Sequence, residues 1–293
     1  MTITSPRHIA IIVTDTPIDG IYEKYGDFGD RSINLLESAE CKTPTKKYQV
    51  CFEEKSDYTE ALNNVFAELE RNWNSGVIQA VLITGSRTDS FASHLPWVAR
   101  LDKFLKEYIL DAGNTTIPTA GICFGHQIMA KMLGCKVGRN LPELGYELGI
   151  TTVELNREIF EIEKSPFLSS LVHENSNLFD HLNIVEFHQD IVYDLPPPGV
   201  CEALNTSFKG IGSTAKCAIQ GIVTANGNVK ILTFQGHPEF TTPETLDMLQ
   251  SDLDQNIITK NQFEKSVYAT KSLNNQGVII GKSIVEFFKL NSV

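Results

Sequence analysis

The chain has 293 residues, of which 42% are hydrophobic, so it carries enough apolar surface for a substantial core. Lys and Arg total 25 against 36 Asp and Glu, giving a net charge of -11. No overall positive field exists to hold a phosphate backbone or an anionic lipid surface, so we expect neither nucleic acid nor membranes as partners.

The apolar run near the N-terminus is short and stops at Asp15, without the extended apolar region of a signal peptide. We therefore expect a cytoplasmic protein, with a nuclear location left open. The six cysteines show no CxxC spacing, which predicts reduced thiols and no zinc site. They are Cys41, Cys51, Cys123, Cys135, Cys201 and Cys217.

The first half of the chain alternates apolar runs with helical patterns, which is typical of an α/β fold with a mostly parallel sheet and helices on both faces. Asp57 and Glu60 resemble a capping box that opens a helix reaching about Trp73. The expected strands are 8–14, 48–52, 77–83 and 117–122, and the other expected helices are 32–39 and 96–110.

The second half has shorter, more alternating runs, which predicts a smaller mixed or antiparallel sheet. Asn226-Gly227 predicts a hairpin with a type I′ turn, because both residues tolerate positive φ. The expected strands are 149–155, 183–187, 216–224 and 229–234, followed by helices after Pro243 and a last helix over 279–290. We expect one main domain over 1–255 and a C-terminal helical extension over 256–293 packed on it.

The segment around Cys123 predicts a nucleophile elbow, a tight turn between a strand and a helix. Gly121 and Gly125 lie two residues on either side of Cys123, where side chains would be too large for the turn. Amides at the start of the following helix, including that of Phe124, would face the reacting centre and stabilise a thiolate and an oxyanion. Alone, this pattern leaves a buried structural cysteine equally plausible.

A thiol nucleophile needs a base, and a base needs an orienting acceptor. Gln235-Gly-His-Pro-Glu239 supplies both in His237 and Glu239, directly after the apolar strand that ends at Phe234. Taken alone, this segment could equally be a surface turn in which the histidine has no catalytic role. Together with the elbow, the segment favours a cysteine-nucleophile site.

The two segments together resemble the class I, or triad-type, glutamine amidotransferases. The likeness is carried by Gly121-Ile-Cys-Phe-Gly-His-Gln127 and Gly236-His-Pro-Glu239, and it runs over about residues 77 to 240. Stand-alone fungal amidotransferase-like proteins and plant γ-glutamyl peptidases are the most similar members. The resemblance implies the family's flavodoxin-like α/β fold.

For the site, the resemblance implies Cys123 as nucleophile, His237 as general base and Glu239 as the carboxylate that orients it. It also implies that Gln127 contacts the glutamine substrate. The oxyanion loop would be Thr84-Gly85-Ser86, with the Gly85 amide donating, although the family usually has a second glycine there.

Further candidates are less specific. His126 follows the nucleophile on the helix and is interpreted as structural. His188 either lines the substrate pocket or is a solvated histidine at a strand end. The loop over 15–30 either shapes specificity or is a mobile surface segment.

No phosphate-binding loop or dinucleotide fingerprint is present, so we expect no cofactor and no metal, and no acceptor site for ammonia within the chain. The resulting prediction is a stand-alone hydrolase of a small-molecule γ-glutamyl substrate, either glutamine or a γ-glutamyl peptide, through a thioester. A glutaminase subunit that serves a synthetase partner in trans, and a non-catalytic binding module, remain the alternatives.

Overall fold

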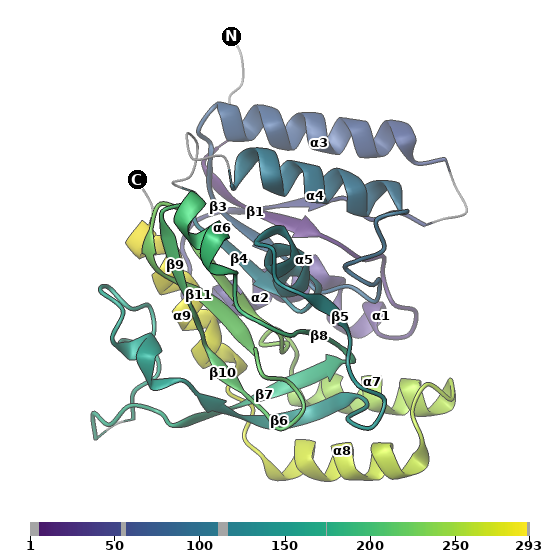
Figure 1. Cartoon of the computed structure of the whole chain (residues 1–293). Helices are drawn as coiled ribbons and strands as arrows, with labels where there is room; N and C mark the ends of the chain where they lie inside the picture. The colour runs from purple at the N-terminus through teal and green to yellow at the C-terminus, as the bar shows by residue number, and fades with distance from the viewer. Residues whose placement is uncertain (1–5, 54–56, 111–116, 174, 292–293) are drawn as a thin grey trace.

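The computed structural model describes residues 6–53, 57–110, 117–173 and 175–291. Its centre is a seven-stranded sheet with strand order β2-β1-β3-β4-β12-β11-β9, shown in Figure 1. The strands from β2 to β12 in this order are parallel, and β11 and β9 complete the sheet through antiparallel pairs. The strand bounds are β1 His8–Val13, β2 Thr45–Gln49, β3 Ile78–Ile83, β4 Thr119–Ile122, β9 Thr206–Gly210, β11 Gly221–Gly227 and β12 Ile231–Phe234. The predicted mostly parallel α/β fold is confirmed.

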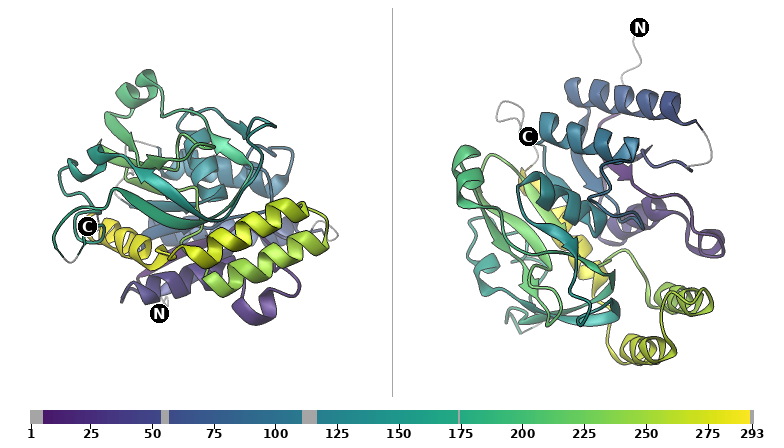
Figure 2. Two further views of the ribbon diagram at one scale, coloured as in Figure 1. Left: turned by 90° about the horizontal axis from the view of Figure 1, so that it is seen from below. Right: turned by 45° about the vertical axis from the view of Figure 1, so that its right-hand side comes forward.

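Helices cover both faces of this sheet because its central strands are apolar on both sides. Ile9, Ile11 and Leu82 point into one core with side chains of α2 and α9, while Ile12 and Val81 point into the other with side chains of α3, α4 and α5. The two layers are visible in Figures 1 and 2. The bounds are α2 Phe28–Ser38, α3 Thr59–Asn74, α4 Pro96–Tyr108, α5 Phe124–Met132 and α9 Gly277–Asn291.

The second half of the chain adds two small antiparallel sheets, as its alternating pattern predicted. One has the order β10-β6-β7 and the other pairs β5 with β8. Helices α7 and α8 lie side by side beyond the first of these sheets (Figure 2). The bounds are β5 Val137–Arg139, β6 Glu147–Leu155, β7 His181–His188, β8 Asp190–Val192, β10 Gly212–Ser213, α7 Thr242–Asp254 and α8 Lys260–Ser272, with short helices α1 Tyr22–Tyr25, α6 Pro198–Ala203 and a 3-10 turn over Arg157–Phe160.

The capping box predicted at Asp57 is wrong. The cap position of α3 belongs to Tyr58, and no side chain caps it. The Asp57 carboxylate accepts from the Thr59 amide, at 3.1 Å, and lies one residue too early to reach the third amide of the helix. A capping box does open α2, where Asp27 and Asp30 bond each other's backbone amides, so this helix begins at Phe28 rather than Ser32.

The predicted hairpin between β11 and β12 is present, but its type I′ turn at Asn226-Gly227 is wrong. Both residues belong to β11 and pair with β9, and only Gly227 has positive φ, at 111°. The connection is longer, and the Thr224 hydroxyl closes it by donating to the Val229 carbonyl and accepting from the Ile231 amide. Pairing with a third strand therefore overrides the local turn preference.

The C-terminal helices pack closely on the rest of the chain. Ile280, Ile284 and Phe287 of α9 are buried in the core beneath the main sheet, and α8 packs on β6. A boundary at residue 255 stays a prediction.

Candidate active site

Cys123 lies at the point where β4 ends and α5 begins. Its φ of 50° and ψ of -102° are strained for a residue with a side chain. A Cβ at Gly121 would come within 2.7 Å of the Gly125 backbone, and one at Gly125 within 2.5 Å of the Ile83 carbonyl oxygen. The steric requirement that the glycine spacing predicted is therefore present.

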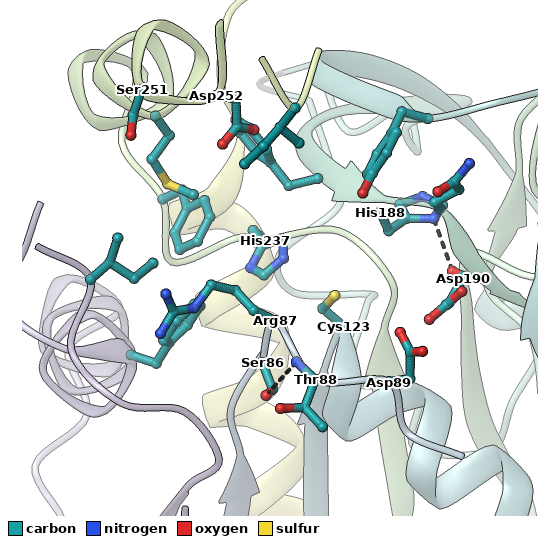
Figure 3. A pocket seen from close by; sticks show the side chains of 18 of the residues that line it. Ser86, Arg87, Thr88, Asp89, Cys123, His188, Asp190, His237, Ser251 and Asp252 are labelled. Atoms are coloured by element: carbon teal, nitrogen blue, oxygen red, sulfur yellow. Dashed lines mark hydrogen bonds between the residues drawn. The ribbon is translucent and has the colours of Figure 1, made fainter. Parts of the chain in front are cut away.

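His237 follows β12, and its side chain enters the same pocket as that of Cys123 (Figure 3). Its Nδ1 lies 2.8 Å from Oε1 of Glu239, and both side chains are almost fully buried. Burial alone would lower the pKa of His237, but the charges of Glu239 and Cys123 raise it well above the usual 6.5. The arrangement favours an imidazolium at His237.

Two backbone amides lie close to these side chains, that of Phe124, which directly follows Cys123, and that of Gly85, which packs against the His237 ring. In the part of the chain that the structure describes, neither the Gly85 nor the Phe124 amide donates a hydrogen bond. Gly85 also leaves room for the His237 ring, because a Cβ at residue 85 would lie 2.7 Å from Cε1 of His237. Both amides are therefore available to an oxyanion.

Gln127 lies on the first turn of α5 and lines the pocket. Its side-chain amide donates to the Asp190 carbonyl at 3.0 Å and to Oε1 of Gln235 at 3.2 Å. Gln235 in turn donates to the Cys123 sulfur at 3.6 Å. The sequence placed Gln235 before His237 without assigning it a role, and the parallel pairing of β4 with β12 brings it to the thiol.

The pocket has a volume of about 320 Å³. Its lining comes from strands, helices and loops that are far apart in the chain, so the sequence alone did not predict which of them meet at the pocket. Besides Cys123, Gln127, His188 and His237, it includes Ile18, Ile21, Phe28, Ser86, Arg87, Thr88, Asp89, Arg139, Tyr146, Phe187, Gln189, Asp190, Phe240, Met248, Ser251, Asp252, Gln255 and Ile257.

The sequence comparisons decide the family. Residues 100–255 match the family model of class I glutamine amidotransferases. A protein of Saccharomyces cerevisiae that is provisionally named a glutamine amidotransferase is 32% identical over 291 residues, which cover 96% of this chain and 97% of that protein. The chain belongs to the class I glutamine amidotransferase family.

Two further likenesses are weaker. γ-Glutamyl peptidase 2 of Arabidopsis thaliana is 26% identical to this chain over 198 residues, covering 68% of each protein. The crystal structure of a glutamine amidotransferase from Thermotoga maritima superimposes with a TM-score of 0.58 at 16% identity, covering 97% of both chains. The latter shows the shared fold alone.

The His188 side chain is buried rather than solvated at a strand end. Its Nε2 lies 3.1 Å from Oε2 of Glu147 and 3.3 Å from Oε2 of Glu186, and its Nδ1 is hydrogen-bonded to the Asp190 carbonyl. Burial opposes the charge on the ring, but the two carboxylates raise the pKa of His188 to about 10. The surroundings therefore favour a protonated His188 ring, which can donate from both nitrogens.

The same three side chains, Glu147, Glu186 and His188, are close enough to hold a metal ion, with ligand atoms within 4.8 Å of one another. Each carboxylate lies within ion-pair distance of the His188 ring. An ion-pair cluster accounts for the geometry, and we assign no metal to it.

The remaining candidates from the sequence, His126 and the loop over 15–30, lie in different surroundings. His126 is fully buried, with Nδ1 at 2.8 Å from the Thr233 hydroxyl, and burial lowers its pKa to about 3. From the loop over 15–30, Phe28 lines the pocket, whereas Tyr25 bonds Asp247 and Tyr22 is exposed. None of the helices in the described ranges is both long and apolar enough to cross a bilayer.

Proposed function

We propose that this family member is a cysteine-dependent hydrolase of γ-glutamyl amides. The observation that carries the proposal is the strained elbow that presents Cys123 to the same pocket as the His237–Glu239 pair. A buried cysteine with only a packing role needs neither the strained φ nor a paired imidazole.

In the proposed reaction the Cys123 thiolate attacks the γ-carbonyl carbon, and the oxyanion accepts hydrogen bonds from the Gly85 and Phe124 amides. The carbon–nitrogen bond then breaks, and His237 gives its proton to the leaving nitrogen. A γ-glutamyl thioester remains on Cys123. Water, which loses a proton to His237, attacks the thioester and releases glutamate and the thiolate.

Gln127 and His188 have different proposed parts in substrate binding. Both Gln127 donors are used internally, and among the described residues its side-chain oxygen accepts no hydrogen bond, so it can accept from the substrate's α-ammonium group. His188 acts as a positioning residue, because its ring holds the Asp190 carbonyl to which Gln127 also bonds.

The test is glutamate release by the purified chain from glutamine, glutathione and γ-glutamyl dipeptides, with Cys123→Ala as the control. We expect turnover of at least one substrate, and none with the control. Absence of turnover while Cys123 remains alkylatable would contradict the proposal. Activity that appears only after a partner is added from the native cell would instead identify a glutaminase subunit.

A further inference from the structure

On the proposed function, the leaving amine lies on the His237 side of Cys123, because that imidazole supplies its proton. This side of the pocket is apolar. The Phe240 ring stacks on the His237 ring at 4.2 Å between centroids, and Phe28 lies at 6.4 Å. Ile18 and Met248 pack against these aromatic rings. A substituent on the leaving nitrogen would therefore run along a hydrophobic wall.

Among the described residues that line the pocket, one carboxylate, that of Asp252, stands on the same side. Asp252, near the end of α7, lines the pocket, and Figure 3 shows it on the far side of His237 from Ser86 and Thr88. Among the residues that the structure describes, no donor bonds its carboxylate and no cation pairs with it. Burial raises the pKa of Asp252 to about 6, so the group is still ionised at neutral pH.

The other charged side chains of the pocket lining already have partners. Arg87 lies 2.8 Å from Asp15. Arg139 lies 3.0 Å from Asp89 and 3.1 Å from Asp190. Asp252 is therefore the unpaired charge among the described lining residues, and it can be satisfied by a cation on the ligand.

We propose that Asp252 and the apolar wall form a leaving-group subsite for a cationic amine, so that γ-glutamyl amides of diamines are preferred substrates. This assignment rests on the proposed γ-glutamyl hydrolysis. One amino group of the diamine is released from the amide and receives the His237 proton, while the other, as an ammonium ion, faces Asp252. Leaving groups that end in a carboxylate are disfavoured, because they would place two negative charges together.

The subsite can be tested by calorimetric binding to the Cys123→Ser variant, which does not depend on turnover. The ligands are the γ-glutamyl amides of diaminobutane, butylamine and aminobutanoate. Each of the three amines has four carbon atoms, and they differ in the charge at the far end. We expect the diamine amide to bind about 10-fold more tightly than the butylamine amide, as for a partly screened charge pair, and the aminobutanoate amide to bind most weakly.

Adding Asp252→Asn should reduce the ratio of the diamine and butylamine affinities to about one. Adding Asp254→Asn should leave the ratio unchanged, because Asp254 lies on the same helix but is exposed and outside the pocket lining. Equal binding of the three ligands, preference for the carboxylate ligand, or a ratio that survives Asp252→Asn would overturn the subsite. Failure of the proposed function is distinguishable, because it would show as absent glutamate release by the wild type.

Discussion

At the scale of single residues, Glu239 contacts His237, and in the proposed mechanism it acts on Cys123 through that imidazole. Glu239→Gln keeps the shape but removes the charge that raises the pKa of His237, so the imidazolium loses its proton at lower pH. We expect kcat to fall by about 100- to 10,000-fold. The alkaline limit of the rate profile should move to lower pH. A profile of kcat/KM against pH with an unmoved alkaline limit would contradict this role.

Gly85 is expected to be needed for space as well as for its amide. In Gly85→Ala the new methyl group would meet Cε1 of His237 at 2.7 Å and displace the ring. Misplacing a catalytic group costs about 100-fold in rate. Gly138→Ala is the matched control, because a Cβ there has nothing within 4 Å. If kcat/KM from steady-state kinetics falls equally in both variants, the contact with His237 is not the cause of the loss.

Removing His188 should destabilise the fold, because Glu147 and Glu186 would lose the positive charge that they share. His188→Asn would leave Glu147 and Glu186 facing each other in the interior, which we expect to cost about 3 kcal/mol of unfolding free energy at neutral pH. Urea unfolding of wild type and variant measures this difference.

The pH dependence of the same cluster follows from the raised pKa of His188. Protonated His188 stabilises the folded state fully below the unfolded value of 6.5, and this contribution is lost as pH rises through about 10. The stability difference between wild type and His188→Asn should therefore shrink over this range. A difference that is constant with pH would show that the histidine is not charged in the folded state.

At the scale of elements, we expect packing of α9 on the main sheet to contribute substantially to the free energy of unfolding. Ile284 is fully buried, so Ile284→Ala should lower the unfolding free energy by about 2–5 kcal/mol. Val278 on the same helix is 47% exposed, and Val278→Ala should change stability little. Chemical denaturation of both variants measures the contrast. If Ile284→Ala leaves the unfolding transition unchanged, residues 256–293 are a detachable extension.

Structural features that depend on neighbouring residues in the chain were predicted well from the sequence. The elbow at Cys123 is local, because a strand, two glycines and a helix within a few residues determine the turn. Eight of the twelve strands among the described residues, and most of the longer helices, followed from apolar periodicity, whereas the short strands β5, β8 and β10 and the strand β9 were not predicted. Asn226-Gly227 was misread because pairing of β11 with β9 is a long-range contact that local turn preference does not include.

At the scale of the whole molecule, the parts of the pocket that the sequence missed come from distant segments. Asp252 and Met248 lie on a helix that only the tertiary fold brings over the Cys123 pocket. The cluster at His188 depends on the register of β6 and β7, which places Glu147 opposite His188. Glu186 then shares their face because it lies two residues before His188 on the same strand. Neither arrangement has a signal in one sequence without knowledge of strand pairing.

The central claim is covalent catalysis at Cys123, and it is tested most directly by trapping the thioester. The protein would be mixed with a γ-glutamyl substrate, quenched in acid within the first turnover and digested for mass spectrometry. We expect a γ-glutamyl adduct on the peptide that contains Cys123, and no adduct in Cys123→Ala. Release of glutamate at an undiminished rate by Cys123→Ala would contradict the account.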